Sequence, residues 1–133
     1  MRLISKILSV GLAVTVFSSC HEGLDFDKLQ KNFQDSLSTV VPTWNAMKLK
    51  PENDGTQLLL VIGDPTFYGT SNDFKTKKAD ELGLMILRMA GKNNYLASGT
   101  LIVTKDPKNQ SESPEDGQKF AIDFSALKKQ MGQ

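Results

Sequence analysis

Apolar residues recur at helical spacing in a first segment after residue 24. The positions three and four apart are Phe26, Leu29, Phe33, Leu37 and Val40. Asp25 precedes them as a candidate N-cap. The Val41-Pro42 pair predicts the end of this helix, because the residue before proline avoids helical geometry. The apolar stripe predicts a helix that packs one face onto a core.

A second segment shows the same spacing, at Ala79, Leu82, Ile86 and Met89. Ser71 or Asn72 is the candidate cap, and Gly91 is the candidate terminator. Gly83 lies inside this helix, where glycine costs about 1 kcal/mol relative to alanine. We expect a close contact between helix and sheet at that position.

Four other segments are predicted to be strands. They cover residues 44–49, 58–62, 95–104 and 119–124. The segment Leu58–Ile62 is a continuous aliphatic run, which is typical of a strand in the middle of a sheet. The run Pro51–Gly55 has the composition of a turn and predicts that the first two strands form a hairpin. Ser125 is a candidate cap for a short last helix.

The predicted order is helix, two strands, helix, two strands, which defines an α+β fold. This αββαββ order resembles a circular permutation of the ferredoxin-like sandwich. We therefore expect two helices on one face of a four-stranded antiparallel sheet. The permutation implies the strand order third, fourth, second, first, with residues 58–62 and 119–124 at the centre.

The segment Gly63–Asn72 is the candidate site for a ligand or partner, because it follows the most hydrophobic strand directly. Asp64, Phe67 and Tyr68 combine a charge with two aromatic rings there, and aromatic residues in polar loops often anchor binding. The alternative is that Phe67 and Tyr68 fold back over the sheet as core residues.

The start of the chain has the anatomy of a secretory signal. Arg2 and Lys6 precede the apolar run Ile7–Phe17, whose eleven residues would cover about 16 Å as a helix, roughly half a bilayer core. The run ends in Ser18-Ser19-Cys20. This arrangement resembles a bacterial lipoprotein signal, which implies that Cys20 becomes the lipidated (palmitate-bearing) first residue. The alternative is an ordinary secretory signal in which Cys20 is incidental.

The resemblance divides the chain into a signal peptide (1–19), a lipidated anchor with a short tether (20–24) and a single globular α+β domain (25–133). In such lipoproteins aspartate after the cysteine retains the protein in the inner membrane, and here that position is His21. The resemblance therefore implies the outer membrane of a Gram-negative cell, with the domain facing the periplasm or the cell surface.

Composition excludes several classes of function. Cys20 is the only cysteine, so no disulfide or cysteine-rich zinc site can form within the chain. Without Arg2 and Lys6, fourteen basic residues remain against fifteen acidic ones, a balance that suggests no nucleic-acid partner.

The sequence predicts no catalytic residues, no metal site and no cofactor. His21, the only histidine, has no partner to orient it, and Ser125 with Lys128 lacks the companion motifs of acyl-transfer enzymes. We expect a non-enzymatic binding or adaptor module, held to the membrane by the lipid on Cys20, with an envelope protein as a candidate partner. The alternative is a small envelope hydrolase or enzyme inhibitor whose site forms only in three dimensions.

Overall fold

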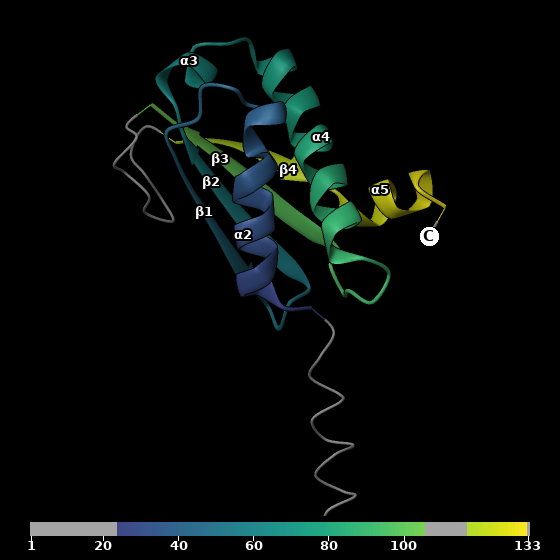
Figure 1. Ribbon diagram of the computed structural model, residues 1–133. Helices are drawn as coiled ribbons and strands as arrows, with labels where there is room; N and C mark the ends of the chain where they lie inside the picture. The colour runs from purple at the N-terminus through teal and green to yellow at the C-terminus, as the bar shows by residue number, and fades with distance from the viewer. Residues whose placement is uncertain (1–23, 106–116, 133) are drawn as a thin grey trace, which may run out of the picture.

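The computed structural model describes residues 24–105 and 117–132. The predicted signal segment, Cys20 and His21 lie outside the described residues, as does most of the polar connection between the last two strands. The described part is an α+β fold in which helices pack against one four-stranded sheet (Figure 1).

Both predicted long helices are present. Helix α2 covers Phe26–Ser36, and a 3₁₀ turn, Leu37–Thr39, continues it toward Pro42. Asp25 caps α2, with its Oδ1 accepting from two N–H groups of the first turn at 3.1 and 3.2 Å. Helix α4 covers Asn72–Ala90, with Ser71 as N-cap and Gly91 ending it at a φ of +78°.

The sheet has the order β1-β2-β3-β4. Its strands are β1 (Ala46–Glu52), β2 (Gln57–Gly63), β3 (Ser98–Thr104) and β4 (Gln118–Ile122). Strands β1 and β2 form the predicted antiparallel hairpin, β2 and β3 are parallel, and β3 and β4 are antiparallel. The sheet is therefore mixed.

The expectation of an antiparallel, permuted ferredoxin-like sheet was wrong. Strand β2 is central, as predicted, but β4 lies at the edge beside β3 instead of between β2 and β3. The burial of the two strands explains this placement. Four consecutive β3 residues, Leu101–Thr104, are buried on both faces, whereas β4 alternates partly buried and exposed positions before Ile122. A strand that is half solvated suits an edge.

Two short helices accompany the two long ones: α3, which the sequence analysis did not predict, and α5, which corresponds to the expected short last helix. Helix α3 covers Pro65–Tyr68 inside the predicted loop, and α5 covers Phe124–Gln130. The N-cap of α5 is Asp123 and not Ser125: Asp123 Oδ1 accepts from the N–H of Ala126 at 3.0 Å.

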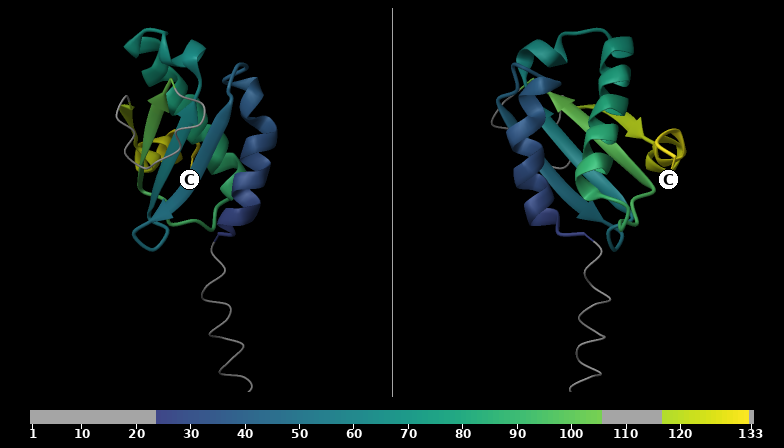
Figure 2. Two further views of the ribbon diagram at one scale, coloured as in Figure 1. Left: turned by 90° about the vertical axis from the view of Figure 1, so that its left-hand side faces the viewer. Right: turned by 45° about the vertical axis from the view of Figure 1, so that its right-hand side comes forward.

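Helices α2 and α4 lie on the same face of the sheet, and α5 lies past the β4 edge (Figures 1 and 2). The main core fills the space between these helices and the sheet. Its fully buried members include Phe33, Leu60, Ile62, Leu82, Ile86, Leu101 and Phe124. On the other face of the sheet, Leu59, Val61 and Ile102 form a second, smaller buried cluster.

Candidate functional site

Asp64 is a structural residue in this fold. Its side chain is only 1% exposed and caps α3, with Oδ1 accepting from the N–H of Thr66 at 3.1 Å. Its Oδ2 accepts from the hydroxyl of Thr43 at 2.5 Å, and its backbone N–H donates to the carbonyl of Thr104 at 2.9 Å. Asp64 thus joins α3, the segment before β1 and the end of β3, and both of its carboxylate oxygens accept hydrogen bonds from the protein.

The two predicted aromatic residues point to different places. Phe67 is 3% exposed and belongs to the main core, as the alternative interpretation expected, and its ring meets that of Phe74 edge-on with centroids 6.4 Å apart. Tyr68 is half-buried, and the Nζ of Lys75 lies 6.0 Å from its ring centroid. The structure therefore does not bring the three candidate residues together as one site.

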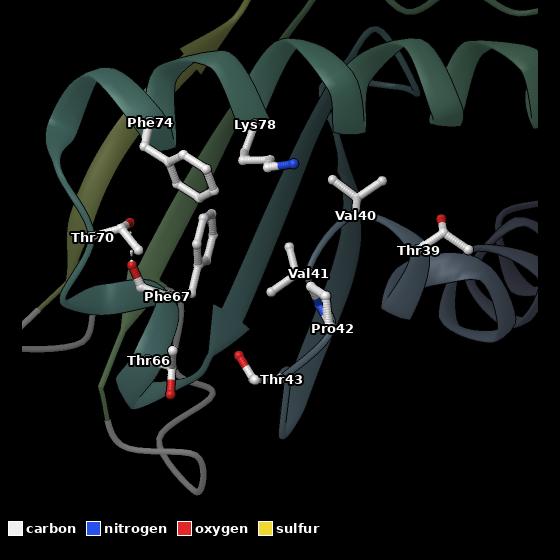
Figure 3. Close-up of a pocket in the computed structure, with 10 residues that line it drawn as sticks. All are labelled: Thr39, Val40, Val41, Pro42, Thr43, Thr66, Phe67, Thr70, Phe74 and Lys78. Atoms are coloured by element: carbon white, nitrogen blue, oxygen red, sulfur yellow. Dashed lines mark hydrogen bonds between the residues drawn. The ribbon is translucent and has the colours of Figure 1, made fainter.

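Phe67 instead forms the floor of a pocket that three segments enclose. The segments are the chain between α2 and β1, helix α3 with the turn after it, and the first two turns of α4 (Figure 3). The pocket has a volume of about 350 Å³. The residues that line it are Thr39, Val40, Val41, Pro42, Thr43, Thr66, Phe67, Thr70, Phe74 and Lys78.

The walls of this pocket are largely apolar. Figure 3 shows the Phe67 and Phe74 rings facing Val41 and Pro42 across the pocket. Three of the four threonine hydroxyls that line it donate to the protein: Thr39 to the Ser36 carbonyl and Thr70 to the Phe67 carbonyl, both at 2.7 Å, and Thr43 to Asp64 Oδ2. The arrangement suits an apolar or aromatic group more than a strongly polar ligand.

Lys78 is the only charged residue among those that line the pocket. Its Nζ lies 5.2 Å from the centroid of the Phe74 ring and 3.3 Å from Oε2 of Glu81, so a carboxylate already accompanies the charge. The lining holds no carboxylate, histidine or cysteine among the described residues.

Phe74 is the exposed aromatic residue of the pocket, and the sequence analysis did not identify it as a site residue. Its side chain is 43% exposed, and only Phe74 and Tyr95 are exposed large hydrophobic residues in the described part of the chain. A sequence signal was available. The stripe of α4 extends back from Ala79 to position 75, which is a lysine, so Phe74 stands beside the stripe and not in it.

Lys75 occupies that core position and is only 1% exposed. Its Nζ donates to the Thr70 carbonyl, which joins the start of α4 to the turn after α3. Burial lowers the pKa of the Lys75 amine from its ordinary value of 10.5, because desolvation disfavours the charged form. Lys75 thus holds the backbone that carries Phe67 and Phe74.

Within residues 24–105 and 117–132, no group of three or more His, Cys, Asp or Glu side chains could hold a metal ion. Among the described helices, none has the length and apolar composition needed to cross a membrane.

Comparisons of the chain with protein-family models, with curated proteins and with solved structures found no match.

Proposed function

We propose that this protein is a lipid-anchored component of the bacterial cell envelope whose folded part is a non-catalytic binding module. The pocket that Phe67 and Phe74 line opposite Val41 and Pro42 is its contact site. The observation that carries the proposal is an open pocket of about 350 Å³ with apolar walls and a half-exposed phenylalanine at its rim. Such pockets accept one large apolar side chain or a small apolar ligand.

The position of the pocket fits an anchored binder. The pocket lies at the end of the molecule where α2 finishes and α4 begins, whereas the chain enters α2 at the opposite end (Figure 1). A lipid on Cys20, four residues before Leu24, would tether that opposite end. The pocket would then face away from the membrane, where another envelope protein can reach it.

The pocket chemistry favours binding over the alternative of a small hydrolase. A hydrolase needs a nucleophile or an acid–base pair that converges on one substrate atom. The pocket offers threonine hydroxyls, of which those of Thr39 and Thr70 donate to the protein itself, and one lysine beside a glutamate. Its occupant would be held by apolar contact with Phe67, Phe74 and Val41.

Site-specific photo-crosslinking in intact cells tests the contact site. Thr66 is exposed and lines the pocket, and Thr76 is another exposed threonine, in α4, that does not line it. Each would be replaced in turn by p-benzoylphenylalanine. We expect one adduct of defined mass from position 66 and none from position 76. Phe74→Ser should reduce the yield about tenfold, since removing an aromatic anchor costs roughly 1–2 kcal/mol of binding free energy.

The same adduct from both positions, or none from position 66, would contradict the proposed contact site. The anchoring is tested separately by mass spectrometry of the protein purified from membranes. The mature protein should begin at Cys20 and carry the mass of the lipid, and Cys20→Ala should release the protein from the membrane fraction.

A further inference from the structure

Three segments far apart in the sequence meet at the end of the molecule opposite the pocket. They are the start of α2, the turn of the β1–β2 hairpin and the loop 91–97 between α4 and β3 (Figures 1 and 2). The N–H of Ala97 donates to the carbonyl of Thr56 at 2.8 Å, which joins the loop to the hairpin turn. Leu24 and Lys28 line a small cleft together with Met89 and Ala90, so the start of α2 lies beside the end of α4.

This end, defined as the tether end, stays close to any lipid on Cys20. Leu24 is four residues after Cys20, and an extended chain covers at most about 3.6 Å per residue. The start of the fold therefore lies within about 14 Å of the lipidated residue. This inference rests on the anchoring proposed above, but not on the binding role of the pocket.

The tether end displays the most exposed aromatic side chain that the structure describes. Tyr95 is 69% exposed, although its neighbours Asn94 and Leu96 are 7% and 1% exposed. The Asn94 side chain fixes the loop: its Nδ2 donates to the Gly91 carbonyl at 2.6 Å and its Oδ1 accepts from the N–H of Leu96 at 3.1 Å. Buried residues on both sides thus hold Tyr95 outward on a defined loop.

Tyrosine has the chemistry of a bilayer interface, because its ring is apolar and its hydroxyl remains hydrated at the level of the lipid headgroups. The charged residues on the three segments carry both signs, with Asp25, Asp27 and Asp54 against Lys28 and Lys92. This slight acidic excess gives no attraction to an anionic surface. The insertion of one tyrosine ring contributes little free energy of membrane binding. The tether on Cys20, however, makes the contact intramolecular and holds the domain at an effective concentration in about the millimolar range beside the bilayer.

We propose that the tether end rests on the zwitterionic headgroup region of the bilayer, with the Tyr95 ring inserted among the headgroups. The contact fixes the orientation of the domain and directs the pocket that Phe67 and Phe74 line away from the membrane. Tyr68, in α3 at the opposite end, remains far from the lipid.

The two tyrosines of the sequence, Tyr68 and Tyr95, allow a direct test with 3-fluorotyrosine and ¹⁹F NMR. The mature chain from residue 20 would be coupled through its single thiol, Cys20, to a maleimide lipid in phosphatidylcholine nanodiscs. A gadolinium chelate on some lipid headgroups broadens nearby resonances. We expect the Tyr95 resonance to broaden at least fivefold more than that of Tyr68. Equal broadening, or more at Tyr68, would overturn the proposal.

A variant separates membrane contact from mere proximity. Tyr95→Ser should let the tethered domain reorient, so that the broadening of the Tyr68 resonance increases at least twofold, while Tyr95→Phe should leave it unchanged. An unchanged Tyr68 resonance in Tyr95→Ser would show that the ring does not orient the domain. Because Cys20 is joined to the maleimide lipid chemically, this experiment can fail or succeed whether or not the native protein is lipidated. Its result is also independent of the photo-crosslinking at the pocket.

Discussion

At the scale of single residues, the burial of positions 74 and 75 in α4 is the reverse of what their side chains lead one to expect. The helical stripe assigns position 75 to the core, yet a lysine occupies it, while Phe74 is left 43% exposed. Burying a phenylalanine side chain stabilises a fold by about 1.5–3 kcal/mol relative to leaving it exposed, and part of this is forgone at Phe74. Residues that violate the local pattern without a structural gain often mark functional surfaces. Here the exposed Phe74 side chain forms the rim of the pocket.

The buried amine of Lys75 predicts a specific dependence of stability on pH. Below its lowered pKa, the amine is protonated in both the folded and the unfolded state, and stability does not change with pH. Between that pKa and 10.5, the unfolded state binds more protons, so the free energy of unfolding rises with pH. Lys75→Met removes this contribution. Urea denaturation from pH 7 to pH 10.5 should show wild type gaining stability relative to Lys75→Met as pH rises. Parallel profiles would contradict the prediction.

The sequence identified part of the pocket but not its boundaries. Phe67 was selected because it follows the most hydrophobic strand, and that residue does line the pocket. The segment Thr39–Thr43 and Phe74 were not selected, because their approach to Phe67 depends on how α2 and α4 pack over the sheet. Asp64 was selected for its charge, but its oxygens accept bonds from α3 and from Thr43.

At the scale of elements, two glycines allow α4, α5 and the sheet to approach closely. A Cβ on Gly83 would lie 2.6 Å from Cδ1 of Leu127 and 2.8 Å from Cγ2 of Ile122. A Cβ on Gly99 would lie 2.8 Å from Cε2 of Phe124 and 2.9 Å from the backbone oxygen of Leu58. The close contact that Gly83 predicted from the sequence is thus confirmed, and it joins α4 to both α5 and the sheet.

These contacts predict that Gly99→Ala destabilises the protein more than Gly83→Ala. At position 83 the contacting atoms belong to side chains, and alanine gains about 1 kcal/mol of helix propensity. At position 99 a backbone oxygen is among the contacting atoms and cannot move without disturbing the β2–β3 pairing. We expect a loss of about 2–3 kcal/mol for Gly99→Ala and about 1 kcal/mol or less for Gly83→Ala, measured by urea denaturation. A neutral Gly99→Ala would contradict the packing described here.

The sequence analysis missed one short helix and placed the start of another two residues late. Helix α3 has four residues, too few to show a hydrophobic period, although Asp64 before Pro65 matches an N-cap followed by proline at the first helical position. Helix α5 was expected, but its cap was placed two residues late, because Asp123 was assigned to the strand.

At the scale of the whole molecule, the order of the strands was beyond the sequence pattern. Hydrophobicity placed β2 in the interior of the sheet correctly, because Leu58–Ile62 is buried throughout. The same argument failed for β4, whose Phe120 and Ile122 pack against the main core from an edge position. An apolar face shows that a strand is covered on one side, but not which strands flank it.

Native-state hydrogen exchange would distinguish this sheet from the antiparallel permutation that the sequence suggested. In the order β1-β2-β3-β4, both neighbours protect the amides of β2 and β3, whereas β4 has one neighbour and can fray from the edge. We therefore expect the slowest exchange in Leu58–Ile62 and Leu101–Val103, with β4 exchanging at least tenfold faster. The permuted sheet instead places residues 119–124 at the centre and β3 at the edge, so it predicts slow exchange in β4 and fast exchange in β3. Slow β4 amides would overturn the topology on which the placement of α4, and with it Phe74 and the pocket, depends.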